Sequence, residues 1–173
     1  MNILEQILKA QGGAQVREMA GQLGLGEAET RKGMESLLPA LTGALQKNVA
    51  QPSGSEQLFN ALRDGNHSRY IEQAGAMRNP ETITDGNKIL GHLLGGKDVS
   101  RQVAQQAAQK SGLQEGVLKK MLPMLATMAM GSMAKQTKSQ GISGSGALGG
   151  MLGSFLGGGK SGGIGGAIGK LFG

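Results

Sequence analysis

The apolar residues of this chain recur at helical spacing and do not alternate as they would in a β-strand. In the first such segment, Ile3, Ile7 and Leu8 fall on one face of a helix. Residues 34–49 repeat the pattern over a longer stretch. Residues that favour strands are few, and Phe, Tyr and Trp together make up 2% of the sequence. We therefore expect an all-α, multihelical fold with an aliphatic, methionine-rich core.

Glycine, proline and capping residues divide this pattern into separate helices. Pro80 suits the first position of a helix, Asp98 suits an N-cap, and Gly112 suits the glycine that closes a helix. Pro39 lies inside an apolar pattern that resumes after it, which predicts a kink and not an end. The residues Gln-Pro-Ser-Gly-Ser at 51–55 are predicted to form a loop.

The chain contains an internal repeat. Each copy has an apolar pair repeated at helical spacing, a short helix closed by Gly-Leu, and a longer helix with a proline between apolar residues. The first copy occupies residues 3–8, 16–23, 24–25 and 37–41, and the second occupies 89–94, 99–108, 112–113 and 121–125. We therefore expect one domain over residues 1–137, able to fold alone. It should contain two pseudo-symmetric helical subdomains, about 1–50 and 86–137, joined by short helices.

Residues 138–173, the C-terminal tail, have a different composition. From residue 141 onward, 15 of 33 residues are glycine. Small residues recur every fourth position, with apolar residues such as Phe155 and Phe172 between them. The recurring positions include Gly149, Gly153 and Gly157, and then Gly158, Gly162 and Gly166. This is a glycine-zipper pattern, in which missing side chains let two helix backbones approach closely.

Such a helix is not stable by itself in water. Each glycine costs roughly 0.8–1 kcal/mol of helix stability relative to alanine. The tail is therefore either ordered by a partner surface or flexible.

The excess positive charge lies in the C-terminal third of the chain. The net charge is +6, and residues 116–173 hold six lysines and no acidic residue. This asymmetry fits an acidic partner such as an anionic membrane surface or a nucleic acid. The alternative is that a few lysines only keep the tail soluble. Nucleic acid is the weaker candidate, because one Tyr and three Phe offer little surface for base stacking.

The residues needed for catalysis or metal binding are scarce. Cysteine is absent, and the two histidines, His67 and His92, lie 25 residues apart. The Gly-Lys-Asp-Val-Ser stretch at 96–100 lacks the glycine spacing of a phosphate-binding loop. The two Asp-Gly-Asn triplets at 64–66 and 85–87 are interpreted as turns. The sequence therefore predicts no enzyme activity, no cofactor and no metal site.

No membrane-targeting segment is expected either. The N-terminus lacks the basic region of a signal peptide. No run of about 18 uncharged apolar residues suggests a transmembrane helix.

Methionines form a stripe near the end of the second copy. Met121, Met124 and Met128 recur at helical spacing, followed by Met130 and Met133. Methionine adapts its shape both in cores and at binding surfaces. The stripe is therefore either part of the core or a face that binds another chain.

Several longer motifs resemble those of the YidB-like bacterial proteins, a family of unknown function. They are GNHSRY at 65–70, DGNKILGHLLGGKDVSRQVAQQAAQKSGL at 85–113, KKMLPMLATMAMGSMAKQ at 119–136, and LLPALTGALQKN in the first half. The chain departs from the expected pattern at Gly26 and Gln114, where a Ser or Asp cap would be typical. The resemblance implies an all-helical bacterial cytoplasmic protein, and it brings no catalytic residues.

We therefore expect a non-enzymatic helical interaction module that associates with itself or with another protein. The alternative is a peripheral membrane or envelope binder acting through the cationic tail, and nucleic-acid binding is the weaker alternative. The candidate interaction residues are Met121, Met124, Met128, Gly149, Gly153, Gly157, Gly162, Gly166, Phe155 and Phe172.

Overall fold

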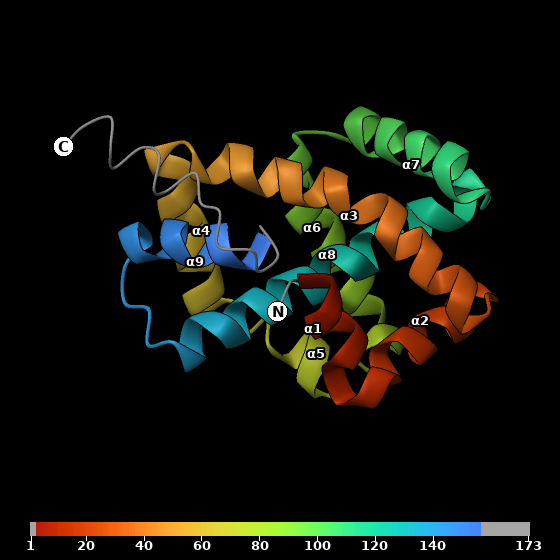
Figure 1. The fold of residues 1–173 in the computed structure, drawn as a ribbon, viewed down its shortest axis with the longest axis horizontal. Coiled ribbons are helices and arrows are strands. Elements are labelled where there is room, and N and C mark those ends of the chain that lie inside the picture. Colours follow the sequence, from red (N-terminus) through yellow and green to blue (C-terminus); the bar gives the residue numbers. More distant parts are fainter. Residues whose placement is uncertain (1–2, 157–173) are drawn as a thin grey trace.

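The computed structural model describes residues 3–156, with side chains to residue 153. This part of the chain is all-α and contains no strand, as expected (Figure 1). The α-helices are α1 (Ile3–Lys9), α2 (Ala14–Leu23), α3 (Glu27–Val49), α4 (Pro52–Asp64), α5 (Arg69–Glu72), α6 (Pro80–Leu94), α7 (Lys97–Ser111), α8 (Glu115–Ser139) and α9 (Ser145–Leu156). Two short 3₁₀-helices, η1 (Ala10–Gly13) and η2 (Ala76–Arg78), lie between them.

Helix α8 runs through the middle of the fold (Figure 1). Every residue from 121 to 134 is buried. Helices α1, α3, α6 and α7 are among those that contact it. A helix that is apolar on all sides is stable only when it is covered on all sides. Two of its threonines bond within the helix: the Thr127 hydroxyl donates to Met124 O at 2.7 Å, and the Thr137 hydroxyl donates to Met133 O at 2.8 Å.

At two points, another part of the backbone packs directly against the backbone of α8. A Cβ atom on Gly86 would lie 2.2 Å from the carbonyl oxygen of Pro123 and 2.7 Å from its Cα. A Cβ atom on Gly131 of α8 would lie 2.8 Å from the carbonyl oxygen of His67. Glycine is therefore required at both points, because any larger residue would push a neighbouring backbone away from α8.

The two copies of the repeat have the same order of elements but different positions in the fold. Gly24 and Gly112 end α2 and α7 with φ values of +66° and +73°, which confirms the predicted closing role of Gly112. Neither Pro39 nor Pro123 ends its helix. However, Pro39 is exposed on α3, whereas Pro123 is buried on α8. The copies share one continuous core, so they are not separately packed subdomains.

Two predictions near the starts of helices were wrong. Asp98 is not an N-cap, because α7 already begins at Lys97; its side chain is 91% exposed and pairs with Arg101 at 3.5 Å. Residues 51–55 are not a loop, because Pro52 begins α4. Gly54 belongs to the first turn of that helix, where a Cβ would lie 2.0 Å from Asn48 O. This glycine therefore permits close packing and does not form a turn.

The start of α6 agrees with the sequence. Pro80 occupies the first turn, and the Asn79 side chain accepts a hydrogen bond from the Glu81 amide at 3.0 Å. The triplet at 85–87 continues this helix, so its interpretation as a turn was wrong. Packing of Gly86 against α8 outweighs the turn preference of Asp, Gly and Asn.

Helix α9 belongs to the core, although it lies beyond the predicted domain boundary at residue 137. Leu148, Met151 and Leu152 are buried members of the core. The helix packs against α4 and α3. The core therefore extends into the first part of the C-terminal tail.

We predict opposite effects for two glycine substitutions on α6. Gly86→Ala should lower the free energy of unfolding by about 1–3 kcal/mol, because its Cβ would overlap the Pro123 carbonyl. Gly91→Ala is the matched control, since no atom lies within 4 Å of its Cβ position. It should raise stability by roughly 0.5–1 kcal/mol. Urea denaturation followed by circular dichroism measures both, and equal effects would contradict the close α6–α8 contact.

We also predict that the position of a truncation within the tail decides how stable the shortened chain is. A chain ending at residue 137 should be less stable than one ending at residue 156, because it loses three buried side chains of α9. Each such side chain contributes up to roughly 1.5–3 kcal/mol, partly offset by the cost of ordering the helix. Thermal melts of the two truncated chains make the comparison. Identical melting temperatures would show that α9 contributes nothing to the core.

Candidate functional site

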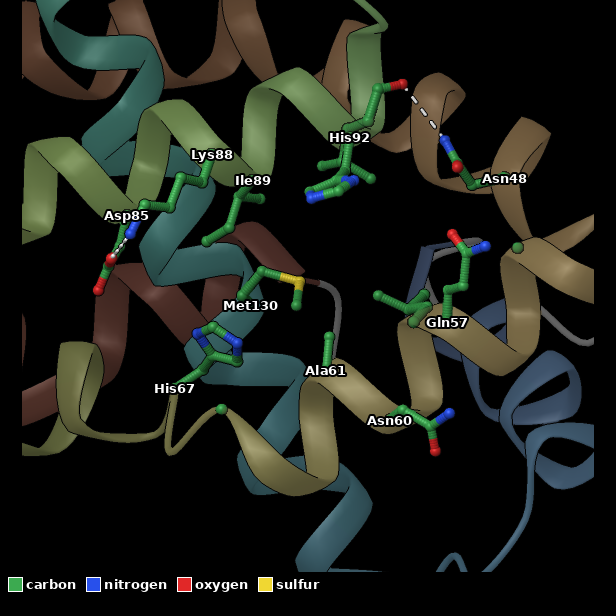
Figure 2. Close-up of a pocket in the computed structure, with 14 residues that line it drawn as sticks. Asn48, Gln57, Asn60, Ala61, His67, Asp85, Lys88, Ile89, His92 and Met130 are labelled. Atoms are coloured by element: carbon green, nitrogen blue, oxygen red, sulfur yellow. Dashed lines mark hydrogen bonds and ion pairs between the residues drawn. The ribbon is translucent and has the colours of Figure 1, made fainter.

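A cleft of about 750 Å³ lies between α4 and α6 (Figure 2). It is lined by Asn48, Gly54, Gln57, Leu58, Asn60, Ala61, Gly65, His67, Asp85, Lys88, Ile89, His92, Leu93 and Met130. The cleft brings together two motifs that are separate in the sequence, GNHSRY at 65–70 and DGNKILGH at 85–92.

The two walls of the cleft present polar side chains above an apolar floor. On α6, Asp85, Lys88 and His92 follow one another at helical spacing along one face. Gln57 and Asn60 lie on α4 (Figure 2). The floor includes the buried side chains of Leu58, Ile89 and Met130. The cleft thus has the mixed lining that is typical of binding sites for small molecules.

One end of the cleft is closed by a link between α3 and α6. The side-chain nitrogen of Asn48, Nδ2, donates to Leu93 O at 3.2 Å and to Ala44 O at 3.0 Å. Figure 2 shows the contact with α6 as a dashed line. This link fixes the end of α6 against α3.

At the opposite end, a cluster of charged and polar groups surrounds Asp85. The Tyr70 hydroxyl donates a short hydrogen bond to Asp85 Oδ2. Arg69 Nη2 donates to the same oxygen at 2.9 Å and to the Tyr70 hydroxyl oxygen at 2.7 Å. Lys88 Nζ lies 3.5 Å from Asp85 Oδ1. Since both oxygens of the carboxylate face donors, the cluster holds Asp85 in one position.

The protonation of this cluster follows from its contacts. The hydrogen bond from Tyr70 and the charges of Lys88 and Arg69 lower the pKa of Asp85. Burial and the hydrogen bond to Asp85 raise the pKa of Tyr70. At neutral pH the pair is therefore a carboxylate that accepts from a neutral phenol.

His67 lies next to this cluster and is half-buried. Its ring centroid is 6.1 Å from that of Tyr70. Burial is the main reason that the pKa of His67 is lowered, and the charge of Arg69 acts in the same direction. Asp85 and the backbone of Ala61 oppose this shift. His67 Nδ1 is buried without a hydrogen-bond partner, so a proton there would have no acceptor.

The geometry does not suggest a metal centre or a phosphate loop. His67, His92 and Asp85 line the same cleft, yet residues 3–156 contain no group of three or more ligands placed to hold a metal ion. Residues 96–100 lie at the start of α7 and do not follow a strand. The cleft is therefore suited to binding through hydrogen bonds, one cationic side chain and an apolar floor.

The predicted methionine stripe lies in the core. Met121, Met124 and Met128 are at most 2% exposed. Because α8 is covered by neighbouring helices, these side chains do not form an accessible face in the folded chain. Their interpretation as interaction residues was wrong, and the alternative, core packing, is correct.

The predicted glycine stripe lies on the surface of α9 as far as the described residues extend. Gly149 and Gly153 are exposed, and so are Gly146 and Gly150 on the same side of the helix. No atom of the described residues lies within 4 Å of a Cβ built at any of these four glycines, which we call the glycine face. Phe155 is part of α9, but its side chain lies outside the described part of the chain. Gly157, Gly162, Gly166 and Phe172 also lie outside the described residues.

Comparison with known proteins assigns most of the chain to one family. Residues 5–136 match a family described as a bacterial protein of unknown function, DUF937. The chain belongs to this family. The part that matches the DUF937 family includes every residue that lines the cleft, and it ends before α9 begins. No curated protein and no solved structure matches the chain. Within residues 3–156, no helix has the combined length and apolar character needed to cross a membrane.

The cleft was not predicted from the sequence, although residues that form it lie in recognisable motifs. The triplet at 85–87 and the GNHSRY motif hold most of the charged and aromatic groups that later meet around Asp85. Because the triplet was interpreted as a turn, Asp85 was not assigned to the same helix as Lys88 and His92. Recognising that 85–92 continues one helix would have placed all three on one face.

We predict that protonation of His67 destabilises the folded protein. Its pKa is lowered in the folded state, so the unfolded chain, with an ordinary histidine pKa of about 6.5, binds the proton first. Stability contributed by neutral His67 is present above about pH 6.5 and is lost as the pH falls below it. Asp85 titrates below this window, since its own pKa is lowered from an already acidic value.

His67→Asn should therefore reduce the loss of stability between about pH 7 and pH 5. His92→Asn serves as the matched control, because His92 is exposed. Urea unfolding midpoints at several pH values make the measurement. If the wild-type midpoint does not change with pH over this range, or if both variants change it equally, the assignment to His67 is wrong.

Proposed function

We propose that this DUF937 protein is a non-enzymatic helical module that assembles with copies of itself through the glycine face of α9. The observation that carries the proposal is the two-sided character of α9. One side anchors the helix in the core through Leu148, Met151 and Leu152. The other side presents Gly146, Gly149, Gly150 and Gly153 to solvent.

The glycine face has no structural role within the described chain. Glycine in an exposed helix costs roughly 0.8–1 kcal/mol per residue relative to alanine. At Gly86 and Gly131 an internal contact explains why glycine is present, because a side chain would collide with a neighbouring backbone. At the four positions of the glycine face, residues 3–156 supply no such neighbour. Close packing against a second copy would supply the missing reason.

The contacts of the cleft support the non-enzymatic part of the proposal. Asp85 is held by Tyr70, Arg69 and Lys88. It is therefore a poor candidate for a general base, since its lowered pKa makes it weakly basic.

The family resemblance supports a cellular location and a more specific family assignment. Within the DUF937 family we assign the chain to the YidB-like proteins, on the motifs at 65–70 and 85–113. We place it in the bacterial cytoplasm. An anionic membrane surface is the competing partner for the cationic tail, and nucleic acid is a weaker one.

The test is the effect of added bulk on the glycine face. Gly149→Leu with Gly153→Leu should leave the fold intact, because both positions are open in the single chain. The same pair should reduce the assembly to monomer, because two helix backbones could no longer approach closely. Gly21→Leu is the control, since Gly21 is an exposed and open helix glycine on α2. Light scattering at several protein concentrations gives the mass of each variant.

Two outcomes would contradict the proposal. A wild-type chain that is monomeric at all concentrations excludes self-assembly. An assembly that survives the double substitution excludes the glycine face. Co-sedimentation with anionic vesicles, compared between wild type and Lys160→Glu with Lys170→Glu, tests the membrane alternative. Loss of vesicle binding in that variant, together with a monomeric wild type, would favour the membrane.

A further inference from the structure

The cleft between α4 and α6 shares no residue with the glycine face. Its volume of about 750 Å³ lies within the range of about 300–1,000 Å³ found for small-molecule sites. Leu58, Ile89, Leu93 and Met130 provide an apolar floor. Methionine can adjust its shape to a flexible apolar ligand.

The charge around the cleft is positive and localised at one end. Among the described residues that line the cleft, Asp85 is the only acidic one. It faces two cations, Arg69 at 2.9 Å and Lys88 at 3.5 Å. One carboxylate cannot neutralise two cations, so an excess of one positive charge remains.

Lys88 is the cation that keeps donors for a ligand, and its side chain extends toward Asp85 (Figure 2). Arg69 already donates to both Asp85 and Tyr70. Lys88 approaches Asp85 less closely, and its side chain is 71% exposed. An ammonium group has three donors, so Lys88 keeps donors for an anion above the cleft floor.

The remaining polar groups around the cleft are neutral side chains that can donate hydrogen bonds. His92 lies four residues after Lys88 on the same face of α6, and Gln57 and Asn60 lie on α4 (Figure 2). No free carboxylate lines the cleft, because the only one is held by the cluster. A cationic ligand would therefore meet Lys88 without a counter-charge, whereas a single anionic group would meet a complementary one.

We propose that this cleft binds an aliphatic monocarboxylate. The carboxylate lies at Lys88, with His92 beside it, and the hydrocarbon chain covers Ile89, Leu93 and Met130. A single carboxylate matches the single excess charge. A ligand of higher negative charge would leave charge unpaired above an apolar floor.

The experiment uses decanoate as the probe and isothermal titration calorimetry with the full-length chain. Decan-1-ol and decyltrimethylammonium are the neutral and cationic controls, all below the concentrations at which they aggregate. Decanoate should bind at least about tenfold more tightly than either control, because a hydrogen bond to a charged group is worth about 1.5–3 kcal/mol. Its affinity should fall as salt is added.

Five variants locate the site. Lys88→Gln should weaken decanoate binding about tenfold, and Lys88→Arg should restore most of it, because the charge returns. Lys97→Gln, at an exposed lysine of α7, is the control for net charge. Ala61→Trp should abolish binding by filling the cleft from α4, while Ala28→Trp, at an exposed position of α3, should bind as wild type.

The outcomes separate this proposal from its alternatives. Absence of decanoate binding to the wild-type chain overturns it. Equal affinity for decanoate and decan-1-ol, or an unchanged affinity in Lys88→Gln, would mean that the carboxylate is not recognised there. Binding that persists in Ala61→Trp places the ligand elsewhere. Circular dichroism of each variant verifies that a loss of binding is not a loss of fold.

Discussion

The contact between Gly86 of α6 and Pro123 of α8 is the constraint on which the rest of the molecule depends. Backbone meets backbone there, because a Cβ atom on Gly86 would lie 2.2 Å from Pro123 O. A second close contact lies at Gly131, which the backbone of His67 approaches. The two positions on α8 are eight residues apart, about 12 Å along a helix. They hold the two motifs of the cleft at a fixed separation.

The cleft follows from this arrangement of backbones. Gly86 faces α8, and its neighbour Asp85 faces the cluster formed by Arg69 and Tyr70. One face of α6 packs against α8. An adjacent face of α6 borders the cleft, and this face carries Lys88 and His92. The ion cluster around Asp85 and the close helix contact therefore act together. The first fixes the charge at the end of the cleft, and the second fixes the wall that carries it.

Helix α9 connects the core to the proposed assembly. Its buried side gives a fixed orientation to its glycine face. An unattached glycine-rich helix would lose most of its helical structure in water. Anchoring by Leu148, Met151 and Leu152 removes much of that cost before any partner binds. A second copy would then meet a preformed surface, which reduces the entropy lost on association.

The sequence by itself determined the all-α class, the order of helices in each copy of the repeat, and ends such as Gly112 and Pro80. These features depend on local periodicity and backbone preference, which can be recognised within a single segment of the sequence. It did not determine which of the two proline-containing helices would be central, since α3 and α8 carry similar motifs and only α8 is covered on all sides. It also did not reveal the cleft, because Asp85 and Tyr70 are 15 residues apart and meet only after α6 has packed on α8. Tertiary structure decided both, because burial depends on which surfaces cover a helix and not on the pattern of the helix alone.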